Sequence, residues 1–507
     1  MAEQSTAGKV RKYLRGRFTE LLPKEKKAGG QVRKELNPLP ALRSINLRTW
    51  LFVIGSFSSF AAEATAFFVV NLHVKPIAEE FDVSITSMTW GITAALMTRT
   101  IGAVIFGCIG DAYGRKISFL LNLGILAILE IAIAFTNNLR DFIICRALFG
   151  VALGGCFGSA MMQCFDDLPT AAHSFISGVF QQAYSFGYLF AVLITWMFKS
   201  TGIRNWRACF WFLSGVSFLL LIFRACLPET NGFLKTRRYR EYCKANGFKQ
   251  PSTFVQIYLS FKKDWYIVGY MVILMAGFNF FSHSSQDLFP TMLTEQLGYS
   301  LQDSIYTNLI GTFGAIFGGL TIPQFSIISS RRLVIICACT FAAALVYPWG
   351  FVHNYTINIT VFFLQMFVQG SWGLVPTHLN ALVPDSPTKA FFSGVSYQLG
   401  NLAASASSTI ESMLADTYPL KDSNGQVMYN PDNGKPLHDY GRAMATMFGC
   451  VVVYLFLAVF FGPESNPNKD YSLAIMAAKS ENSPMAFEDF EKDSQKDEQS
   501  QTRKSLS

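Results

Sequence analysis

Twelve long apolar runs, each about the length that crosses a bilayer as a helix, dominate this chain of 507 residues. A helix rises about 1.5 Å per residue, so roughly 20 apolar residues span the hydrocarbon core of a membrane. The predicted spans are 49–71, 87–109, 117–136, 141–163, 174–197, 208–227, 265–289, 303–325, 333–352, 357–379, 390–414 and 442–462. The chain is therefore predicted to be an all-α membrane protein that crosses the bilayer many times.

Composition supports a membrane protein and argues against a nucleic-acid-binding one. Charged residues make up 15% of the chain, against about 25% in soluble domains. The 47 phenylalanines suit a surface that contacts membrane lipid. The net charge is +8, but Lys and Arg flank the apolar runs and have no fold of their own, so we expect no nucleic-acid partner. The ten cysteines form no Cys-x-x-Cys pair, and no metal site is predicted.

The distribution of Lys and Arg predicts the orientation. Basic residues are concentrated before the first span, between the sixth and seventh spans, and in the short loops at Arg115–Lys116 and Arg331–Arg332. The positive-inside rule places these segments and both termini in the cytosol. The N-terminal stretch has no short apolar core of a signal peptide, so we expect it to be retained. The predicted domains are a cytosolic tail (1–48), a six-helix bundle (49–227), a cytosolic linker (228–263), a second bundle (264–462) and a cytosolic disordered tail (463–507).

A glycine-rich motif with charges, Gly-Cys-Ile-Gly-Asp-Ala-Tyr-Gly-Arg-Lys at 107–116, ends the second span. Its glycines allow two helices to approach closely, and its charges can hold one conformation closed. It resembles the loop motif of the major facilitator superfamily, except that Ala112 stands where a basic residue is usual. The fourth span begins with an Arg-plus-glycine pattern that is also similar to this superfamily. The resulting prediction is a conformational gate made of Gly107, Asp111, Gly114, Arg115, Lys116 and Arg146. A plain polar turn between spans is the structural alternative.

The two halves of the chain end alike. Leu-Pro-Glu-Thr follows the sixth span at 227–230, and Gly-Pro-Glu-Ser follows the twelfth at 462–465. Matched endings are expected of a duplicated six-helix unit. We therefore predict the major facilitator fold, with 12 transmembrane helices in two pseudo-symmetric six-helix bundles and a ligand site between them near mid-membrane.

Polar residues inside the seventh span are costly and indicate function. Asn279, His283 and Gln286 lie at i, i+4 and i+7, on one face of a continuous helix. His283 and Asp287 are i, i+4 neighbours and can share a hydrogen bond. Such a pair can take up and release a proton near neutral pH. A cluster that only joins helices by hydrogen bonds is the alternative.

The same segment carries a more specific pattern, Asn-x-x-Ser-His-x-x-Gln-Asp-x-x-x-Thr, matched in full by residues 279–291. It resembles the signature of the fungal Jen-type carboxylate:proton symporters, within the sialate:proton symporter-like family. The resemblance covers roughly 49–462. It implies uptake of lactate and pyruvate, or of malate and succinate, across the plasma membrane together with a proton.

Arg99 lies in the middle of the second span, twelve residues before Asp111. Twelve residues correspond to about 18 Å of helix, which places Arg99 near the bilayer midplane. A guanidinium there can bind a carboxylate through two parallel hydrogen bonds. The alternative is an ion pair with Glu63 of span one or with Asp287. Glu63 is itself a predicted proton site, because it lies inside a span that lines the cavity in this fold class.

Span eleven supplies neutral amides, Gln398 and Asn401, at i, i+3. In the Jen-like family a Gln/Asn pair of this span and a Phe of span five are associated with substrate selection, and the resemblance assigns these roles to Gln398, Asn401 and Phe180. Hydrogen bonds between helices are the alternative. Gln365 and Gln369 share a face of span ten and can line the cavity, whereas Glu130 and Glu411 receive no role.

These residues predict a symporter rather than an enzyme, since we find neither a catalytic constellation nor a phosphate-binding loop. The substrate site is predicted at Arg99, Asn279, Gln286, Gln398, Asn401 and Phe180, and proton coupling at Asp287, His283 and Glu63. No cofactor is expected, because the proton gradient supplies the driving force. The expected ligands are small carboxylate anions and protons. Lysines of the tails (Lys479, Lys492, Lys496 and Lys504) are candidate sites for a ubiquitin ligase with an arrestin.

Two other functions stay open. One is a proton-coupled carrier of another solute, such as a sugar, a drug or sialic acid. The other is a carboxylate sensor that does not transport. The sequence does not decide between monocarboxylates and dicarboxylates, although the fairly short N-terminal tail favours dicarboxylates slightly.

Overall fold

The computed structural model describes residue 21 and residues 36–203, 205–245, 251–352, 356–383, 388–421, 426–429 and 436–465. Most of the predicted tails, including the four candidate lysines of the C-terminal tail, lies outside these residues. The described helices are α2 (Leu39–Arg43), α3 (Leu47–Leu72), α4 (Val74–Glu80), α5 (Ile85–Tyr113), α6 (Arg115–Ala134), α7 (Leu139–Phe165), η1 (Thr170–Ala172), α8 (His173–Ser200), α9 (Arg207–Cys226), α10 (Asn231–Ala245), α11 (Thr253–His283), α12 (Phe289–Thr291), η2 (Met292–Gln296), α13 (Leu301–Thr321), η3 (Ile322–Ile327), α14 (Arg331–Ala344), α15 (Val346–Phe351), α16 (Thr356–Trp372), α17 (Val375–Leu382), α18 (Lys389–Ala403), α19 (Ser407–Asp416) and α20 (Tyr440–Phe461).

Several of the predicted spans begin at a polar capping residue. The side chain of Asn46 accepts a hydrogen bond from the first turn of α3, and Asn138 does the same for α7. Ser84, Ser300 and Ser330 cap α5, α13 and α14 in the same way. A cap satisfies one of the backbone N–H groups that the first turn leaves without a partner. These residues therefore set where the helices start.

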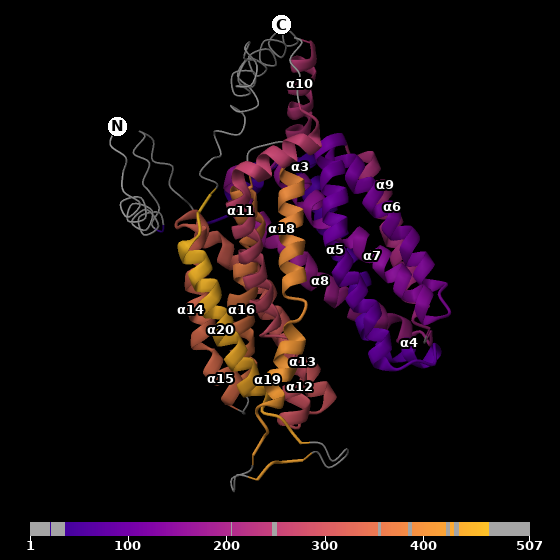
Figure 1. The fold of residues 1–507 in the computed structure, drawn as a ribbon, viewed down its shortest axis with the longest axis vertical. Coiled ribbons are helices and arrows are strands. Elements are labelled where there is room, and N and C mark those ends of the chain that lie inside the picture. Colours follow the sequence, from indigo (N-terminus) through magenta and orange to yellow (C-terminus); the bar gives the residue numbers. More distant parts are fainter. Residues whose placement is uncertain are drawn as a thin grey trace.

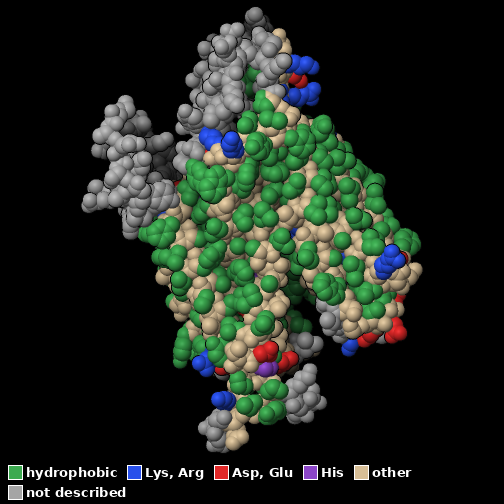
Figure 2. Space-filling model, in the orientation of Figure 1, with side chains coloured by type: hydrophobic (Ala, Val, Ile, Leu, Met, Phe, Trp, Pro, Cys, Tyr) green, Lys and Arg blue, Asp and Glu red, His purple; other side chains and the backbone are tan. Residues whose placement is uncertain are grey.

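Ten helical segments of the described chain are long and apolar enough to cross a membrane. The predicted spans 174–197 and 390–414 do not meet this test, although helices occupy both. The first corresponds to α8, whose 28 residues include Gln181, Gln182 and several serines. The second is divided between α18 and α19. Twelve spans thus remain the prediction, and the helices are consistent with it. Figure 2 shows apolar side chains over the flanks of the molecule, with charges gathered toward its two ends.

The helices form two groups (Figure 1). Helices α3 to α9, coloured indigo to magenta, make one group, and α11 to α20 make the other. The groups approach each other at the end that carries α10 and separate toward the opposite end, near α4 and α12. Figure 2 shows the surface hollowed between them at that opposite end. The structure therefore has one closed end and one open end.

The seventh span ends earlier than predicted. The helix α11 stops at His283, and Ser284–Leu288 form turns. Pro290 has no N–H to continue the helix, and its ring would clash with the carbonyl four residues earlier. Ser285 also donates to the carbonyl of Ser282 at 2.8 Å, a local bond that competes with the helix. The prediction that Gln286 shares a helical face with Asn279 and His283 is therefore wrong.

The predicted span 390–414 is also interrupted, at Ala404–Ala406. The Ser405 hydroxyl donates to the Leu402 carbonyl at 2.7 Å. The break leaves α18 and α19 as two short helices joined by a turn. Irregular backbone at membrane depth is tolerated only where it is buried in protein or lines a cavity.

The repeated Pro-Glu endings make equivalent contacts in the two halves. The Glu229 carboxylate accepts the backbone N–H of Lys116, at the start of α6, at 3.0 and 3.2 Å. The Glu464 carboxylate accepts the N–H groups of Arg331 and Arg332, at the start of α14, at 3.0 and 3.2 Å. A carboxylate at a helix N-terminus satisfies free N–H groups and interacts favourably with the helix dipole. Each half therefore closes its last span onto its third by the same device.

Replacing Glu464 by Gln is expected to lower the free energy of unfolding by about 1–2 kcal/mol, because one oxygen acceptor and the charge are lost. The ion pair with Arg331, 3.0 Å long, is lost as well. The measurement is the melting temperature of the purified protein in detergent. Glu79→Gln is the control, since Glu79 is 68% exposed and meets Lys75 only at 4.0 Å. Equal melting temperatures for Glu464→Gln and the wild type would contradict the role of this contact.

Candidate functional site

Arg99 lies in the middle of α5 and is 7% exposed. Its guanidinium carbon is 4.8 Å from the centre of the Phe67 ring of α3. Its Nε and Nη2 atoms have no hydrogen-bond partner among the described residues. The structure gives Arg99 no ion pair with Glu63 or Asp287 in this part of the chain, so the predicted structural pairing is not formed. The Arg99 guanidinium thus offers unused N–H donors.

Glu63 and Arg146 lie in the same interior as Arg99. Glu63 is buried, interacts electrostatically with Arg99, and has its carboxylate beside the Cys156 thiol of α7. Arg146 is fully buried, 4.6 Å from the Phe149 ring and 5.8 Å from the Phe67 ring. Arg146 was predicted as part of the gate, but the structure places it with Arg99. We call Glu63, Phe67, Arg99 and Arg146 the Arg99 cluster.

Helix α18 brings its amides to the boundary between the two groups of helices. Gln398 is 3% exposed and accepts a hydrogen bond from Asn401 at 2.9 Å. Its Nε2 lies 3.5 Å from the carbonyl oxygen of Gly154 in α7. The backbone of Arg99 lies against the position where Gly154 would carry a Cβ. The predicted amide pair is therefore formed, one helix away from Arg99.

Aromatic residues surround this boundary. Phe180 is fully buried. Its ring centre is 5.4 Å from that of Phe60, on which it stacks, and 5.9 Å from that of Phe157. Phe157 in turn stacks on Tyr397 of α18 at 3.6 Å. Phe180 therefore reaches α18 through Phe157 rather than directly. The sequence did not single out Phe157 or Tyr397, because aromatic residues are common throughout its apolar spans.

A second polar group lies where α11 and the turn after it meet α19. Nδ1 of His283 is 3.0 and 3.1 Å from the two carboxylate oxygens of Asp287, so the predicted pairing is confirmed. The Ser408 hydroxyl donates to Asp287 at 2.6 Å. The side chains of His283 and Asp287 are 45% and 21% exposed. We call these three residues the Asp287 cluster, and solvent reaches it.

The other predicted residues of span seven bind protein groups. Asn279 donates to the Met275 carbonyl of its own helix at 2.8 Å. Gln286 donates to Gln365 of α16 at 2.7 Å, and Gln369 donates to Ser282 at 2.9 Å. The predicted cavity residues Gln365 and Gln369 thus join α16 to the signature of span seven. The hydrogen bonds of Asn279 and Gln286 thus go to Met275 and Gln365 and not to the Arg99 cluster.

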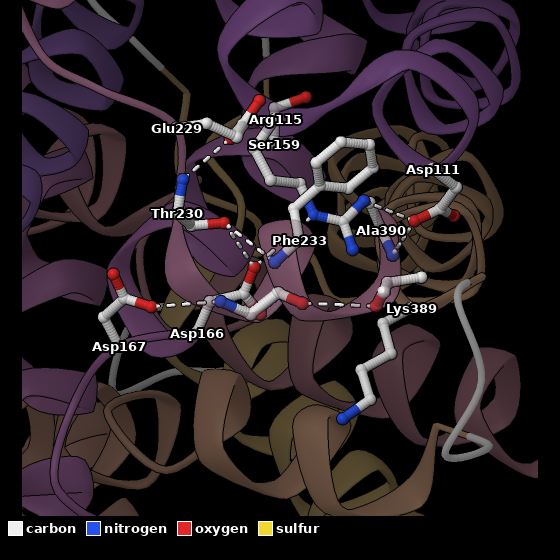
Figure 3. Close-up of polar contacts among 12 residues, drawn as sticks. Asp111, Arg115, Ser159, Asp166, Asp167, Glu229, Thr230, Phe233, Lys389 and Ala390 are labelled. Carbon is white, nitrogen blue, oxygen red and sulfur yellow. Dashed lines mark hydrogen bonds and ion pairs between the residues drawn. The ribbon is translucent and has the colours of Figure 1, made fainter. Parts of the chain in front are cut away.

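Two residues of the predicted gate, Asp111 and Arg115, face each other at the closed end (Figure 3). Asp111 forms an ion pair with Arg115 and accepts the N–H groups of Phe391, at 2.9 Å, and Ala390, at 3.2 Å. These two N–H groups belong to the first turn of α18, so the Asp111 carboxylate sits at a helix N-terminus of the other group of helices. A Cβ at Gly107 would lie 2.8 Å from the Phe391 Cα. The two groups are therefore joined directly here.

The remaining gate residues act within one group of helices. Lys116 donates its ammonium to the Ala225 carbonyl at 2.6 Å and does not join the Asp111 charge cluster, contrary to the prediction. Gly114 has φ = +119°, a conformation that favours glycine. Arg240 of α10, which the sequence did not single out, donates to the carbonyls of Asp111 and Ala112 at 3.1 and 3.2 Å.

Two aspartates after α7 dock the start of α10 beside the gate (Figure 3). Asp166 lies 3.6 Å from Nε of Arg115 and accepts from the Thr230 hydroxyl at 3.1 Å. Asp167 accepts the N–H groups of Asn231 and Gly232 at 3.0 and 3.2 Å. Burial raises the pKa of Asp167 above its ordinary value, while these N–H groups act in the opposite direction. Asp167 therefore caps the first turn of α10, and Asp166 binds the Thr230 side chain just before it.

Comparisons with known proteins agree with this architecture. The family model described as Major Facilitator Superfamily matches residues 51–408. A protein of Saccharomyces cerevisiae named "Carboxylic acid transporter protein homolog" is 34% identical, over 93% of this chain and 76% of its own length. The sialic acid transporter NanX of Escherichia coli is 22% identical, over 65% of this chain and 78% of its own.

A solved structure of the proton:xylose symporter XylE superposes with a TM-score of 0.61 at 16% identity, covering 81% of this chain and 94% of that one. Each of these proteins is named as a transporter or symporter, and the present chain is a multi-pass membrane transporter rather than an enzyme. The predicted fold is confirmed. The chain belongs to the major facilitator superfamily.

Proposed function

We propose that this transporter carries short-chain carboxylates, either lactate and pyruvate or malate and succinate, across the plasma membrane together with protons. The observation that carries the proposal is the buried Arg99 guanidinium, whose Nε and Nη2 donors are unused among the described residues. The name of the 34% identical yeast relative supports a carboxylic acid as substrate. The proton gradient across the membrane would supply the energy for transport, without a cofactor.

Carboxylate binding follows from the donors at the boundary. A guanidinium binds a carboxylate in a two-pronged geometry, and the contact strengthens where water is excluded. Phe67 stacks on Arg99 and restricts its orientation. Asn401 and Gln398 lie one helix away and present amides that can bind the far end of the substrate. Phe180 would limit substrate size through Phe157 and Tyr397.

Proton binding is assigned to the Asp287 cluster. Asp287 and His283 share a hydrogen bond and are partly exposed, so they can exchange protons with solvent. Protonation of Asp287 removes a negative charge from the C-terminal half. The free-energy cost of burying the substrate carboxylate in a closed site then falls. Substrate and proton therefore move together. Glu63, buried close to Arg99, is the second predicted proton site.

Alternating access would use the contact at Asp111. The positive-inside rule places α10 and both termini in the cytosol, which makes the closed end cytosolic and this conformation outward-facing. Opening toward the cytosol requires Asp111 to release the first turn of α18. The other gate residues of this end position Asp111 for this contact: Gly107, Gly114, Arg115 and Lys116. Arg146 is proposed to act with Arg99 instead.

The rival functions have weaker support. A sialic acid carrier rests on a 22% identical relative, and a sugar carrier on a structure that is 16% identical. A sensor would bind carboxylates without moving them. Control by a ubiquitin ligase remains a separate proposal on tail residues that lie outside the described structure.

The experiment uses the purified full chain in lipid vesicles with an imposed pH gradient. Acid outside is expected to drive uptake of labelled substrate, and Asp287→Asn is expected to reduce the gradient-driven component by about tenfold or more for each pH unit, because a pH unit is worth 1.36 kcal/mol per coupled proton. Asp303→Asn is the control, since Asp303 is an exposed residue of the first turn of α13. Gradient-driven uptake that survives in Asp287→Asn would remove this residue from the mechanism.

A further inference from the structure

Glu411 of α19 is a buried carboxylate for which the proposed mechanism has no use so far. Its residue is 0% exposed, and neither carboxylate oxygen has a hydrogen-bond partner among the described residues. It follows Ser408 by three positions, a spacing that makes the two residues neighbours on the surface of α19. Ser408 donates to Asp287, and Asp287 is near enough to interact electrostatically with Glu411. Glu411 therefore belongs beside the Asp287 cluster.

The groups around Glu411 do not compensate a charge on it. From α11 and the turn after it, His283 and Asp287 face this region, and His283 is already bonded to Asp287. On α20, Arg442 lies over the Tyr418 ring at 4.7 Å, and the Tyr440 hydroxyl donates to Glu295 at 2.8 Å. Among the described residues, no arginine or lysine forms an ion pair with Glu411. A buried carboxylate without donors, next to a second carboxylate, favours its neutral, protonated form.

A purely structural role does not account for this arrangement. A Glu side chain that makes no hydrogen bond adds a desolvation cost and no compensating contact. A glutamine of the same shape would avoid the cost of ionisation. A group that must take and release a proton needs the carboxyl.

Glu411 lies on the helix that directly follows the one with the predicted substrate-binding amides. The turn at Ala404–Ala406 separates α18, which carries Gln398 and Asn401, from α19, which carries Ser408 and Glu411. A short helix on a hinge can shift relative to its neighbour when a ligand is bound. A shift of α19 would change the separation of Glu411 and Asp287.

We propose that Glu411 is a second proton carrier, which shares protons with Asp287 during transport. The step is a proton transfer: the carboxylic acid of Asp287 becomes a carboxylate, and the carboxylate of Glu411 becomes a carboxylic acid. A negative charge on Asp287 disfavours a second negative charge on Glu411. The proposal rests on the proton-coupled transport proposed above and adds a residue to it.

The test compares Glu411→Gln with the wild-type protein in vesicles, by two measurements on each. The first is accumulation of labelled substrate under a gradient of about one pH unit, and the second is exchange of labelled for unlabelled substrate without a gradient. We expect accumulation to fall about tenfold, since one coupled proton is lost, and exchange to stay within about twofold. Asp416→Asn is the matched control on the same helix, since the Asp416 side chain is 73% exposed, and both measurements should be unchanged.

Unchanged accumulation in Glu411→Gln would overturn the proposal. So would an equal loss of accumulation and exchange in a variant that melts at the wild-type temperature, because that result indicates a structural role. If Glu411→Gln does not fold, Glu411→Asp decides by its pH profile of uptake. A midpoint shifted by about half a pH unit or more supports the proposal, and an unshifted midpoint refutes it. A wild-type protein without gradient-driven uptake would instead contradict the proposed function itself.

Discussion

Replacing Arg99 by Gln is expected to reduce carboxylate uptake by about a hundredfold, because the loss of one partner of a buried charge pair costs about 2–5 kcal/mol. The reduction should appear in the KM, since the variant retains the gate and the Asp287 cluster. Arg99→Lys keeps the charge but loses the planar fork and the stack on Phe67, so it should recover only part of the activity. The measurement is initial uptake over a range of substrate concentrations.

Arg140→Gln provides the control for Arg99. Arg140 lies exposed at the start of α7, so its loss should leave KM and the maximal rate unchanged. The amount of each variant in the membrane is measured in parallel. Uptake by Arg99→Gln at the wild-type KM would show that the carboxylate binds elsewhere.

Replacing Asp111 by Asn is the second change with a large expected effect. It removes the ion pair with Arg115 and weakens the hydrogen bonds from Phe391 and Ala390. Charge-assisted hydrogen bonds contribute about 1.5–3 kcal/mol, so the closed state should lose about tenfold to a hundredfold in population. Transport should slow, because the outward-facing state is no longer held. Labelling of a cysteine placed at Phe391 from the α10 side measures the opening.

Asp167→Asn separates this effect from a general loosening of the same end. Asp167 binds the start of α10 and no described residue of the C-terminal half of the chain. With a cysteine at position 391, the protein with Asp167→Asn should be labelled at about the same rate as the protein without this substitution. Equal labelling in Asp111→Asn and Asp167→Asn would mean that Asp111 does not hold the two groups of helices together.

Periodic hydrophobicity and local motifs were sufficient to predict the superfamily fold and the approximate course of the spans. The His283–Asp287 hydrogen bond was predictable too, because it depends on residues four positions apart. The end of α11 was predicted wrongly, because the predicted span extends through the polar residues 282–287 to Phe289, whereas Pro290 and the Ser285 hydroxyl oppose continuation of the helix. Hydropathy averaged over a whole span does not reveal such a local interruption of the helix.

Contacts between distant segments could not be predicted from one sequence. Nothing local indicates that Asp111 meets the first turn of α18, or that Arg240 of the linker donates to the end of α5. Arg146 was grouped with the gate by its motif, whereas its depth in α7 places it beside Phe67. Glu411 received no role because its neighbour Asp287 belongs to another span. These residues became informative only once packing brought them together.

Uptake of labelled lactate and labelled succinate in acidic medium, by yeast without its own carboxylate carriers, tests the central claim most directly. The wild-type chain is measured with and without a protonophore, after its presence at the plasma membrane is verified. The account predicts uptake of at least one of the two acids, abolished by the protonophore. Uptake of neither acid, or uptake that the protonophore leaves unchanged, would contradict proton-coupled carboxylate transport.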